Sequence, residues 1–196
     1  MKHYIDLLSI LTPKHLRQGF ENRMQFLCGD FEINIFETFQ SSTKVQIQYD
    51  GLSISSMIRG HKIVNSAQLE DFTFEAGTTL ILPEGQTIFA DFPEADMHNP
   101  VQCATILIPS EKLNQQLESL KLLYPDKEWN LDYTHFHFNN NSDLARAFNE
   151  LLQLTKVPEQ NHTLNDLLLK SFLVRIINAQ HEHIQEMNFL QVNQQL

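Results

Sequence analysis

The chain has 196 residues, and its 42% hydrophobic content with 14 phenylalanines is typical of one folded domain with an aromatic core. The formal net charge is −10 and the lysines and arginines do not cluster, which argues against a direct nucleic-acid surface. No apolar run is long enough to span a membrane, and the N-terminus does not have the pattern of a signal peptide. Cys28 and Cys103 have apolar neighbours, as buried thiols in a reducing cytoplasm do, so we expect a cytoplasmic protein.

The first half of the chain has the pattern of a strand-rich domain. Residues 1–30 are predicted to form an N-terminal segment with a short helix before the first strand. From 31 to 109, short stretches of alternating polar and apolar residues are separated by turns, and Val45, Ile47 and Tyr49 share one strand face. This spacing predicts a closed antiparallel sandwich or barrel. Further strands are predicted at 53–60, 71–74, 78–83, 87–92 and 102–109.

The second half, residues 110–185, is predicted to be helical. Ser110 is expected to cap the first helix, and either Asn141 or Ser142 the second. A third helix is predicted from about Thr163. Mainly β-strands followed by antiparallel helices make this an α+β chain.

The third helix is apolar around most of its circumference. Two interpretations remain open: the helix is buried between the barrel and the second helix, or one of its faces pairs with a second copy of the chain. Residues 186–196, rich in Asn and Gln, are typical of the start of a linker. The residues predicted for dimerisation are Leu167, Leu168, Phe172, Arg175 and Ile176.

Three residues of the strand-rich half carry a resemblance to cupin barrels. Gly77, Pro83 and Gly85 have the spacing of a cupin motif whose following strand supplies a metal-binding histidine. Here Ile88 occupies the histidine position and Phe92 a later asparagine position. The resemblance therefore implies a degenerate cupin-like jelly-roll barrel.

Metal chemistry is not expected in this barrel. The stretch 43–60, where cupins usually carry further ligands, contains no histidine, and divalent metals need several N, O or S donors. We predict no metal, no cofactor and no catalytic residue, with a metal-dependent cupin enzyme kept as an alternative. The residues predicted to bind a partly hydrophobic ligand are Val45, Ile47, Tyr49, Arg59, Ile88 and Phe92.

Two histidine pairs have spacings that invite comparison with metal sites. His135 and His137 lie on one side of an extended segment and are expected on an exposed face opposite buried phenylalanines. His181 and His183 are two residues apart on a predicted helix, which turns their side chains away from each other. Neither pair is predicted to bind a metal.

Five segments resemble the N-terminal effector-binding and dimerisation domain of AraC-family bacterial transcription regulators. The resemblance covers about residues 30 to 180. It implies a homodimer that responds to a small-molecule effector or a regulatory protein, and that contacts promoter DNA only through a helix-turn-helix domain not present in this chain. A barrel that binds a protein antagonist, and a plain dimerisation module, remain alternatives. The segments are FETF (36–39), SMIRGHKIV (56–64), FTFEAGTTLILPEG (72–85), DFPEAD (91–96) and PVQCATILIPSEKL (100–113).

Overall fold

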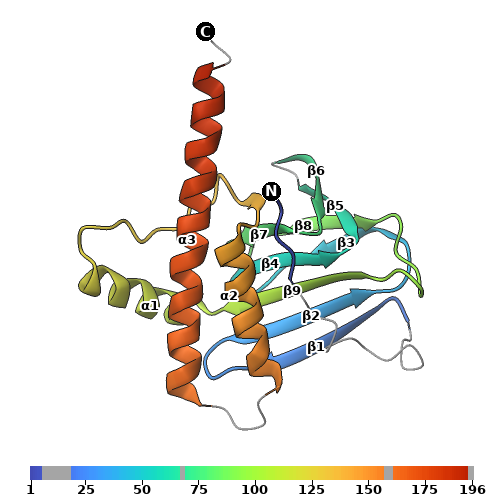
Figure 1. Cartoon of the computed structure of the whole chain (residues 1–196). Coiled ribbons are helices and arrows are strands. Elements are labelled where there is room, and N and C mark those ends of the chain that lie inside the picture. The colour runs from blue at the N-terminus through green and yellow to red at the C-terminus, as the bar shows by residue number, and fades with distance from the viewer. Residues whose placement is uncertain (6–18, 67–68, 157–160, 194–196) are drawn as a thin grey trace.

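Two antiparallel sheets face each other, and helices cover the outer face of the larger one (Figure 1). The computed structural model describes residues 1–5, 19–66, 69–156 and 161–193. Ten strands, three α-helices and a single 3₁₀ turn, Leu154–Lys156, lie within these ranges. No helix among them is both long and apolar enough to cross a membrane.

The larger sheet has six strands in the order β1-β2-β9-β4-β7-β10. The smaller sheet has four, in the order β3-β8-β5-β6. The chain passes repeatedly from one sheet to the other, as in a jelly roll, which confirms the predicted fold class. The strands are β1 (Glu21–Leu27), β2 (Glu32–Thr38), β3 (Ser42–Ile47), β4 (Leu52–Arg59), β5 (His61–Ser66), β6 (Leu69–Glu75), β7 (Thr78–Leu82), β8 (Ile88–Phe92), β9 (Val101–Ile108) and β10 (His137–Asn139).

The inner strands of the larger sheet, β2, β9, β4 and β7, bury both of their faces. On β9, Val101 and Cys103 face the barrel interior, whereas Ala104 and Ile106 face the helices. Strands of the smaller sheet bury only one face, and β8 alternates accordingly between buried and less buried residues. The near-continuous apolar runs of β4, β7 and β9 and the alternating runs of β3 and β8 follow from this difference.

The helices are α1 (Ser110–Leu123), α2 (Ser142–Gln153) and α3 (His162–Asn193). Asn141 caps α2, because its side-chain oxygen accepts a hydrogen bond of 2.8 Å from the Leu144 N–H. The N-cap of α1 is Pro109. Ser110, predicted to be this cap, is instead the first helical residue, and its hydroxyl donates to the carboxylate of Glu84.

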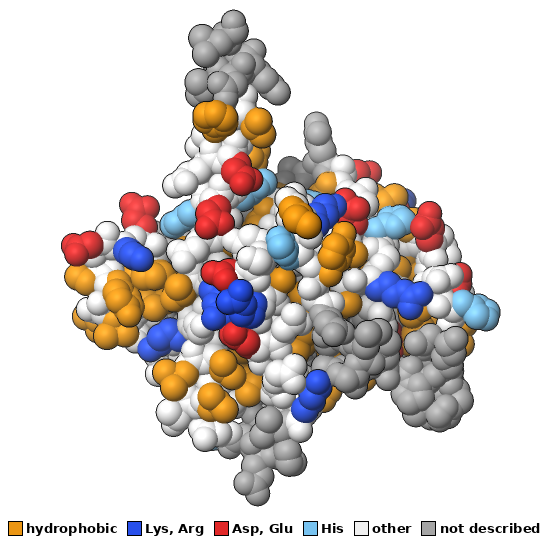
Figure 2. Space-filling view, viewed as in Figure 1, with side chains coloured by type: hydrophobic (Ala, Val, Ile, Leu, Met, Phe, Trp, Pro, Cys, Tyr) orange, Lys and Arg blue, Asp and Glu red, His pale blue; other side chains and the backbone are white. Residues whose placement is uncertain are grey.

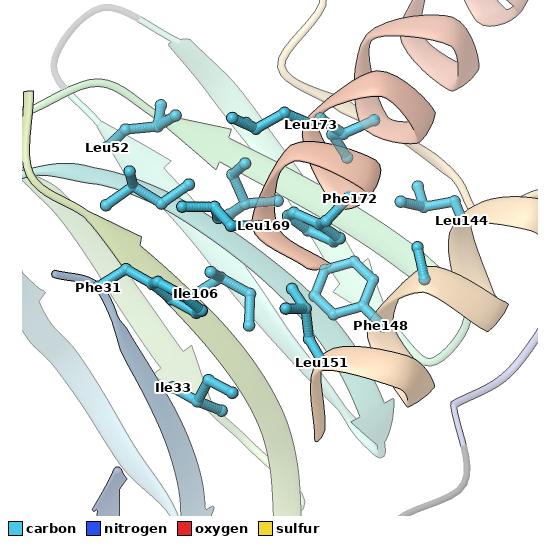
Figure 3. Packing of buried hydrophobic residues seen from close by; sticks show 14 of the residues in the cluster. Phe31, Ile33, Leu52, Ile106, Leu144, Phe148, Leu151, Leu169, Phe172 and Leu173 are labelled. Carbon is cyan, nitrogen blue, oxygen red and sulfur yellow. The ribbon is translucent and has the colours of Figure 1, made fainter. Parts of the chain in front are cut away.

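The main hydrophobic core lies between the six-stranded sheet and the helices α2 and α3 (Figure 3). Phe148 of α2 and Phe172 of α3 meet edge to face with ring centroids 4.9 Å apart. Both rings are fully buried. Because this core closes the outer face of the sheet, the barrel and the helices form one packed unit.

The N-terminal segment differs from its prediction. Glu21–Leu27 forms strand β1, which pairs with β2 at the edge of the larger sheet. The short helix expected before the first strand falls mainly on residues 6–18, outside the described residues. The barrel therefore begins earlier than the predicted boundary at residue 31.

Two further boundaries also differ. The predicted helical region, 110–185, contains strand β10, which pairs with β7. The last helix, α3, has 32 residues and continues through 186–193, where a linker was expected. This last part of α3 projects beyond the sheets (Figure 1).

Truncating the aromatic pair should test the helix–sheet core. Phe148→Ala is expected to lower the free energy of unfolding by about 3–5 kcal/mol, because it leaves a cavity beside Phe172. Arg146→Ala, on the exposed side of the same helix, is the control, and its surface ion pair with Asp143 predicts a change of less than about 1 kcal/mol. Urea unfolding followed by circular dichroism measures both. Equal losses in the two variants would contradict this account of the core.

The ring of His137 should make stability depend on pH. Burial lowers the pKa of His137 from 6.5 to about 4, its Nε2 atom has no hydrogen-bond partner, and the ring lies 4.6 Å from that of Phe72. The unfolded chain therefore binds this proton first, so stability is complete above about pH 6.5 and falls as the pH drops toward 4. The loss should be on the order of 3 kcal/mol at most.

The variant His137→Phe keeps an aromatic ring in the same place and should flatten this pH dependence in urea titrations between pH 7 and 4. His98→Gln, which replaces an imidazole 86% exposed, should keep it. An unchanged slope in His137→Phe would show that another group governs stability in this range.

Candidate functional site

A cavity of about 210 Å³ opens inside the barrel. Strands of both sheets contribute to it, because alternate residues of β1, β2, β3, β5, β8 and β9 point inward. Its lining combines aliphatic and aromatic side chains with a few charged and polar groups. The lining residues are Glu21, Arg23, Phe36, Thr38, Val45, Gln46, Ile47, Gln48, Tyr49, Lys62, Phe92, Val101 and Cys103.

Four of the six residues predicted to bind a ligand line this cavity. Val45, Ile47 and Tyr49 share one face of β3 and the residues after it, and Phe92 lies across from them on β8. The structure thus brings together residues from two strands that pair antiparallel. Whether they bind a ligand stays a prediction.

The other two predicted residues lie elsewhere. Ile88 is 1% exposed and belongs to the barrel's interior packing, but it does not line the cavity. Arg59 is exposed at the end of β4, where its guanidinium donates to the Asn99 side-chain oxygen at 3.0 Å. A role for Arg59 as an anchor inside the lumen does not fit this position, because the side chain is exposed and bonded to Asn99 outside the cavity lining.

Three charged lining residues were missed by sequence reasoning. Glu21 and Arg23 lie on β1, in the segment expected to contain a helix. For Lys62 the sequence favours a solvated turn, with an anion or carboxylate contact for a ligand as the alternative, yet the residue is 6% exposed and lines the cavity on β5. The alternation of Lys62 and Val64 was the available signal, but a lysine on a lumen face runs against the usual exposure of that residue type.

The Lys62 ammonium is held between aromatic rings. Its nitrogen lies 5.4 Å from the ring centroid of Phe74 and 5.7 Å from that of Phe92. Cation–π attraction of this kind is strongest where water is excluded. None of the described carboxylates forms an ion pair with this ammonium.

Arg23, by contrast, is already engaged. Its Nε donates to the side-chain oxygen of Asn34 at 2.9 Å, and its guanidinium lies 3.5 Å from the Glu32 carboxylate. It also stands 5.7 Å from the ring centroid of Phe36. Its charge is therefore largely balanced at the rim of the cavity.

Burial raises the pKa of three other titratable groups of the lining. Burial raises the pKa of Glu21, and a hydrogen bond of 2.9 Å from the Thr38 hydroxyl offsets part of that effect. Burial also raises the pKa of Tyr49 and of the Cys103 thiol. Cys103 is therefore a thiol at neutral pH, which is a poor nucleophile.

The second cysteine is also free and buried, as predicted. Burial raises the pKa of Cys28 to about 11. It lies in the core beneath the helices and not in the barrel interior.

The barrel interior does not offer the donor set that a cupin metal requires. Val45, Ile47 and Phe92 line the lumen, and Ile88 packs into its wall, where nitrogen or oxygen ligands would be needed. Among the residues that the structure describes, no three His, Cys, Asp or Glu side chains are placed to hold a metal ion.

The two histidines of β10 and its approach differ from their prediction. His137 is not on an exposed face but lies largely buried between Phe72 and Phe74. His135 is partly exposed, and its Nδ1 lies 2.9 Å from the carboxylate of Asp132. Sequence spacing alone could not show that β6 would cover the His137 side of the strand.

The residues predicted for dimerisation are divided between the core and the surface. Phe172 and Ile176 are at most 1% exposed and pack in the core of the chain itself. Leu168 is partly buried against that core, and Arg175 pairs with Glu150 of α2 at 2.7 Å. Leu167 is 59% exposed. The buried pair is thus occupied by intramolecular contacts and is not available to a second chain.

Hydrophobic side chains are exposed over α1 and over the first turns of α3 (Figure 2). On α3 these are Leu164, 45% exposed, and Leu167. At the end of α1, Leu122 is 83% exposed, and Leu123 and Tyr124 are also exposed. Both surfaces lie on the helical side of the molecule.

A buried lysine connects the barrel to these helices. Lys112 of α1 is 5% exposed, and its ammonium lies 3.1 Å from the carboxylate of Asp30 and 2.8 Å from that of Asp166. Asp30 belongs to the turn between β1 and β2, and Asp166 to α3. A single side chain thereby joins the edge of the barrel, α1 and α3.

Solved structures with the same arrangement are transcription regulators. An apo ToxT variant from Vibrio cholerae aligns over 74% of this chain and 53% of its own, with 13% identity and a TM-score of 0.54. The AraC-like transcriptional activator CuxR aligns over 82% of this chain and 55% of its own, with 10% identity and a TM-score of 0.54. These likenesses show the fold, and the chain spans a little over half the length of both proteins.

A cupin superfamily protein from Desulfitobacterium hafniense aligns over 56% of this chain and 99% of its own, with 11% identity and a TM-score of 0.40. No curated protein matches the sequence significantly. A family model described as the AraC-type transcriptional regulator N-terminus matches residues 32–184, from β2 through most of α3, so the chain belongs to that family and is a regulatory domain.

Proposed function

We propose that this chain is the effector-sensing and dimerising part of a DNA-binding transcription regulator, and that it binds its effector without chemical conversion. The observation that carries the proposal is the barrel cavity, lined by Val45, Ile47, Tyr49 and Phe92 together with a few polar groups. Cavities of this composition suit small, partly hydrophobic ligands. The neutral Cys103 thiol and the lack of metal donors at the lumen positions favour binding over catalysis.

A second hollow of about 480 Å³ gives the cavity a route to solvent. Arg23, Gln48 and Tyr49 line both spaces. An effector would enter between the β1–β2 hairpin and the end of β3 and pass these three side chains. A bound effector would therefore contact the β1–β2 hairpin and could change its position.

The Lys112 ion pairs supply a physical path from the cavity to α3. A shift of the β1–β2 hairpin moves Asp30, and Lys112 is bonded to both Asp30 and Asp166. The two carboxylates share one largely buried ammonium, so a change in the position of Asp30 alters how strongly Lys112 interacts with Asp166, and the two sides are energetically coupled. A ligand that favours one hairpin position by ~1–3 kcal/mol would bias the position of α3 by the same amount.

The exposed leucines of α3 support pairing with a second copy. Leu164 and Leu167 lie three residues apart on the side of α3 that does not face the sheet. A two-fold arrangement would bring the same stripe of each copy together. The predicted seam is thereby narrowed to the outer face of α3, with Leu167 at its centre.

A protein antagonist remains a second candidate ligand, and the apolar end of α1 favours it. Leu122, Leu123 and Tyr124 form an exposed patch next to Lys121. Apolar patches with a charged rim are typical of protein-binding surfaces. In that case the regulator would be controlled from its helical side and not from the lumen.

Filling the cavity should separate the two candidates. In saturation-transfer NMR with small aromatic fragments, Val45→Trp is expected to weaken saturable binding at least tenfold, because the indole occupies the lumen. Thr43→Trp, exposed on the same strand, should bind like the unmodified chain. Binding that survives in Val45→Trp would place the ligand outside the lumen.

A charged residue introduced into α3 should test whether this helix forms the dimer interface. Leu167→Glu places a carboxylate in the expected seam and should raise the dimer dissociation constant about tenfold or more in sedimentation equilibrium. Leu122→Glu, at a more exposed leucine on α1, should leave the dissociation constant unchanged. A monomeric unmodified chain, or identical behaviour of the two variants, would remove α3 as the seam.

A further inference from the structure

Lys62 places an unpaired positive charge inside the barrel. We propose that the effector is a monocarboxylate with a small apolar or aromatic body, and that the Lys62 ammonium binds its carboxylate. The inference rests on the proposed function, because it assumes that the barrel cavity holds the effector. To the proposed function it adds the charge and the size of the effector.

Burial without a partner is the first observation behind the proposal. Lys62 is 6% exposed and lines the cavity on β5, on the same inward face as Val64. An ammonium removed from water is unfavourable unless an opposite charge or several hydrogen bonds compensate it. None of the described carboxylates lies close enough to form an ion pair with it, and Glu21 of the same lining interacts with its charge only at longer range. A bound carboxylate would supply it.

The aromatic rings explain how the free protein tolerates this charge. Phe74 and Phe92 hold the ammonium at 5.4 and 5.7 Å from their centroids, which fixes its place but leaves its N–H groups without a strong acceptor. The same Phe92 ring lines the cavity beside Val45. A ligand bound at Lys62 would thus have an apolar wall next to its carboxylate.

The other charged groups of the lining point to a single negative charge on the ligand. Arg23 is already bonded to Asn34 and Glu32, so Lys62 is the cation left to bind an anion. Glu21 also lines the cavity; burial raises its pKa, and the charge of Lys62 offsets part of that effect, so a second negative charge on the ligand would meet this carboxyl group. A phosphate, with a charge of about −1.5 to −2, would exceed what one lysine can balance.

The volume limits the body of the ligand. The cavity has a volume of about 210 Å³. This space suits a carboxylate on a phenyl ring or a short alkyl chain. Drug-sized ligands generally need pockets of about 300 Å³ or more.

Matched pairs of acid and amide test the charge at constant shape. Phenylacetate, 3-phenylpropionate and hexanoate should each bind the chain with saturation in calorimetry at pH 7. Each should bind about tenfold or more tightly than its own amide, because only the acid forms a charge-assisted bond with Lys62. Thermal shift assays provide a second readout.

Two variants identify the residue responsible. Lys62→Met keeps most of the length of the side chain but removes the charge, and it should abolish the preference for acid over amide. It should also raise the melting temperature of the free chain, because an unpaired buried charge is removed. Lys121→Met, whose lysine is 47% exposed, is the control and should retain the preference.

The outcomes separate this inference from the function on which it rests. Equal binding of acids and amides, or an undiminished preference in Lys62→Met, overturns the role of Lys62 but leaves the lumen as the ligand site. Absence of saturable binding by all three acids overturns the proposed ligand class. Acid binding that persists in Val45→Trp overturns the lumen as the site and the proposed function with it.

Discussion

The six-stranded sheet is the constraint on which the rest of the molecule depends, because both faces of its inner strands are buried. One face closes the barrel that contains the cavity, and the other carries α2 and α3. Neighbouring residues of β9 serve the two sides in turn, with Cys103 toward the lumen and Ala104 toward the helices. A change in the shape of the lumen therefore reaches a sheet whose outer surface is packed against α3. Close-packed interiors transmit such strain because they have little free volume in which to absorb it.

Two kinds of contact join the barrel to α3. The sheet provides a broad contact between the barrel and α3, and Lys112 provides a specific polar one through Asp30 and Asp166. The two differ in kind. Packing resists separation of the layers, whereas the ion pairs depend on the exact position of the β1–β2 turn. A ligand that shifts the β1–β2 turn would change the ion pairs of Lys112 without separating the packed layers.

Much of the fold could be predicted from sequence because simple periodicities govern it. Val45, Ile47 and Tyr49 alternate as a half-buried strand must, and Gly77 and Gly85 occupy turn positions with φ of 82° and 75°, where L side chains are strained. The replacement of the expected histidine by Ile88 was also visible. Each of these signals lies within one short segment of chain.

What could not be predicted depends on contacts between distant segments. Strand β1 pairs with β2, but its composition near Glu21 and Arg23 carries no strong strand signal. A lysine is usually exposed, so the sequence favours an exposed Lys62. Its position inside the barrel depends on the rings of Phe74 and Phe92, which come from β6 and β8. The burial of Phe172 in the chain's own core likewise follows from α2 lying beside α3. The charged part of the candidate site was therefore the part that sequence reasoning missed.

The length of α3 amplifies small movements. Its 32 residues correspond to about 48 Å at 1.5 Å per residue, and only part of that length rests on the sheet. The first part of the helix is fixed to the sheet, and the rest extends beyond it. A tilt of about 5° over the full length of the helix moves its far end by about 4 Å, so a small rearrangement around a bound molecule would change the direction in which that end points.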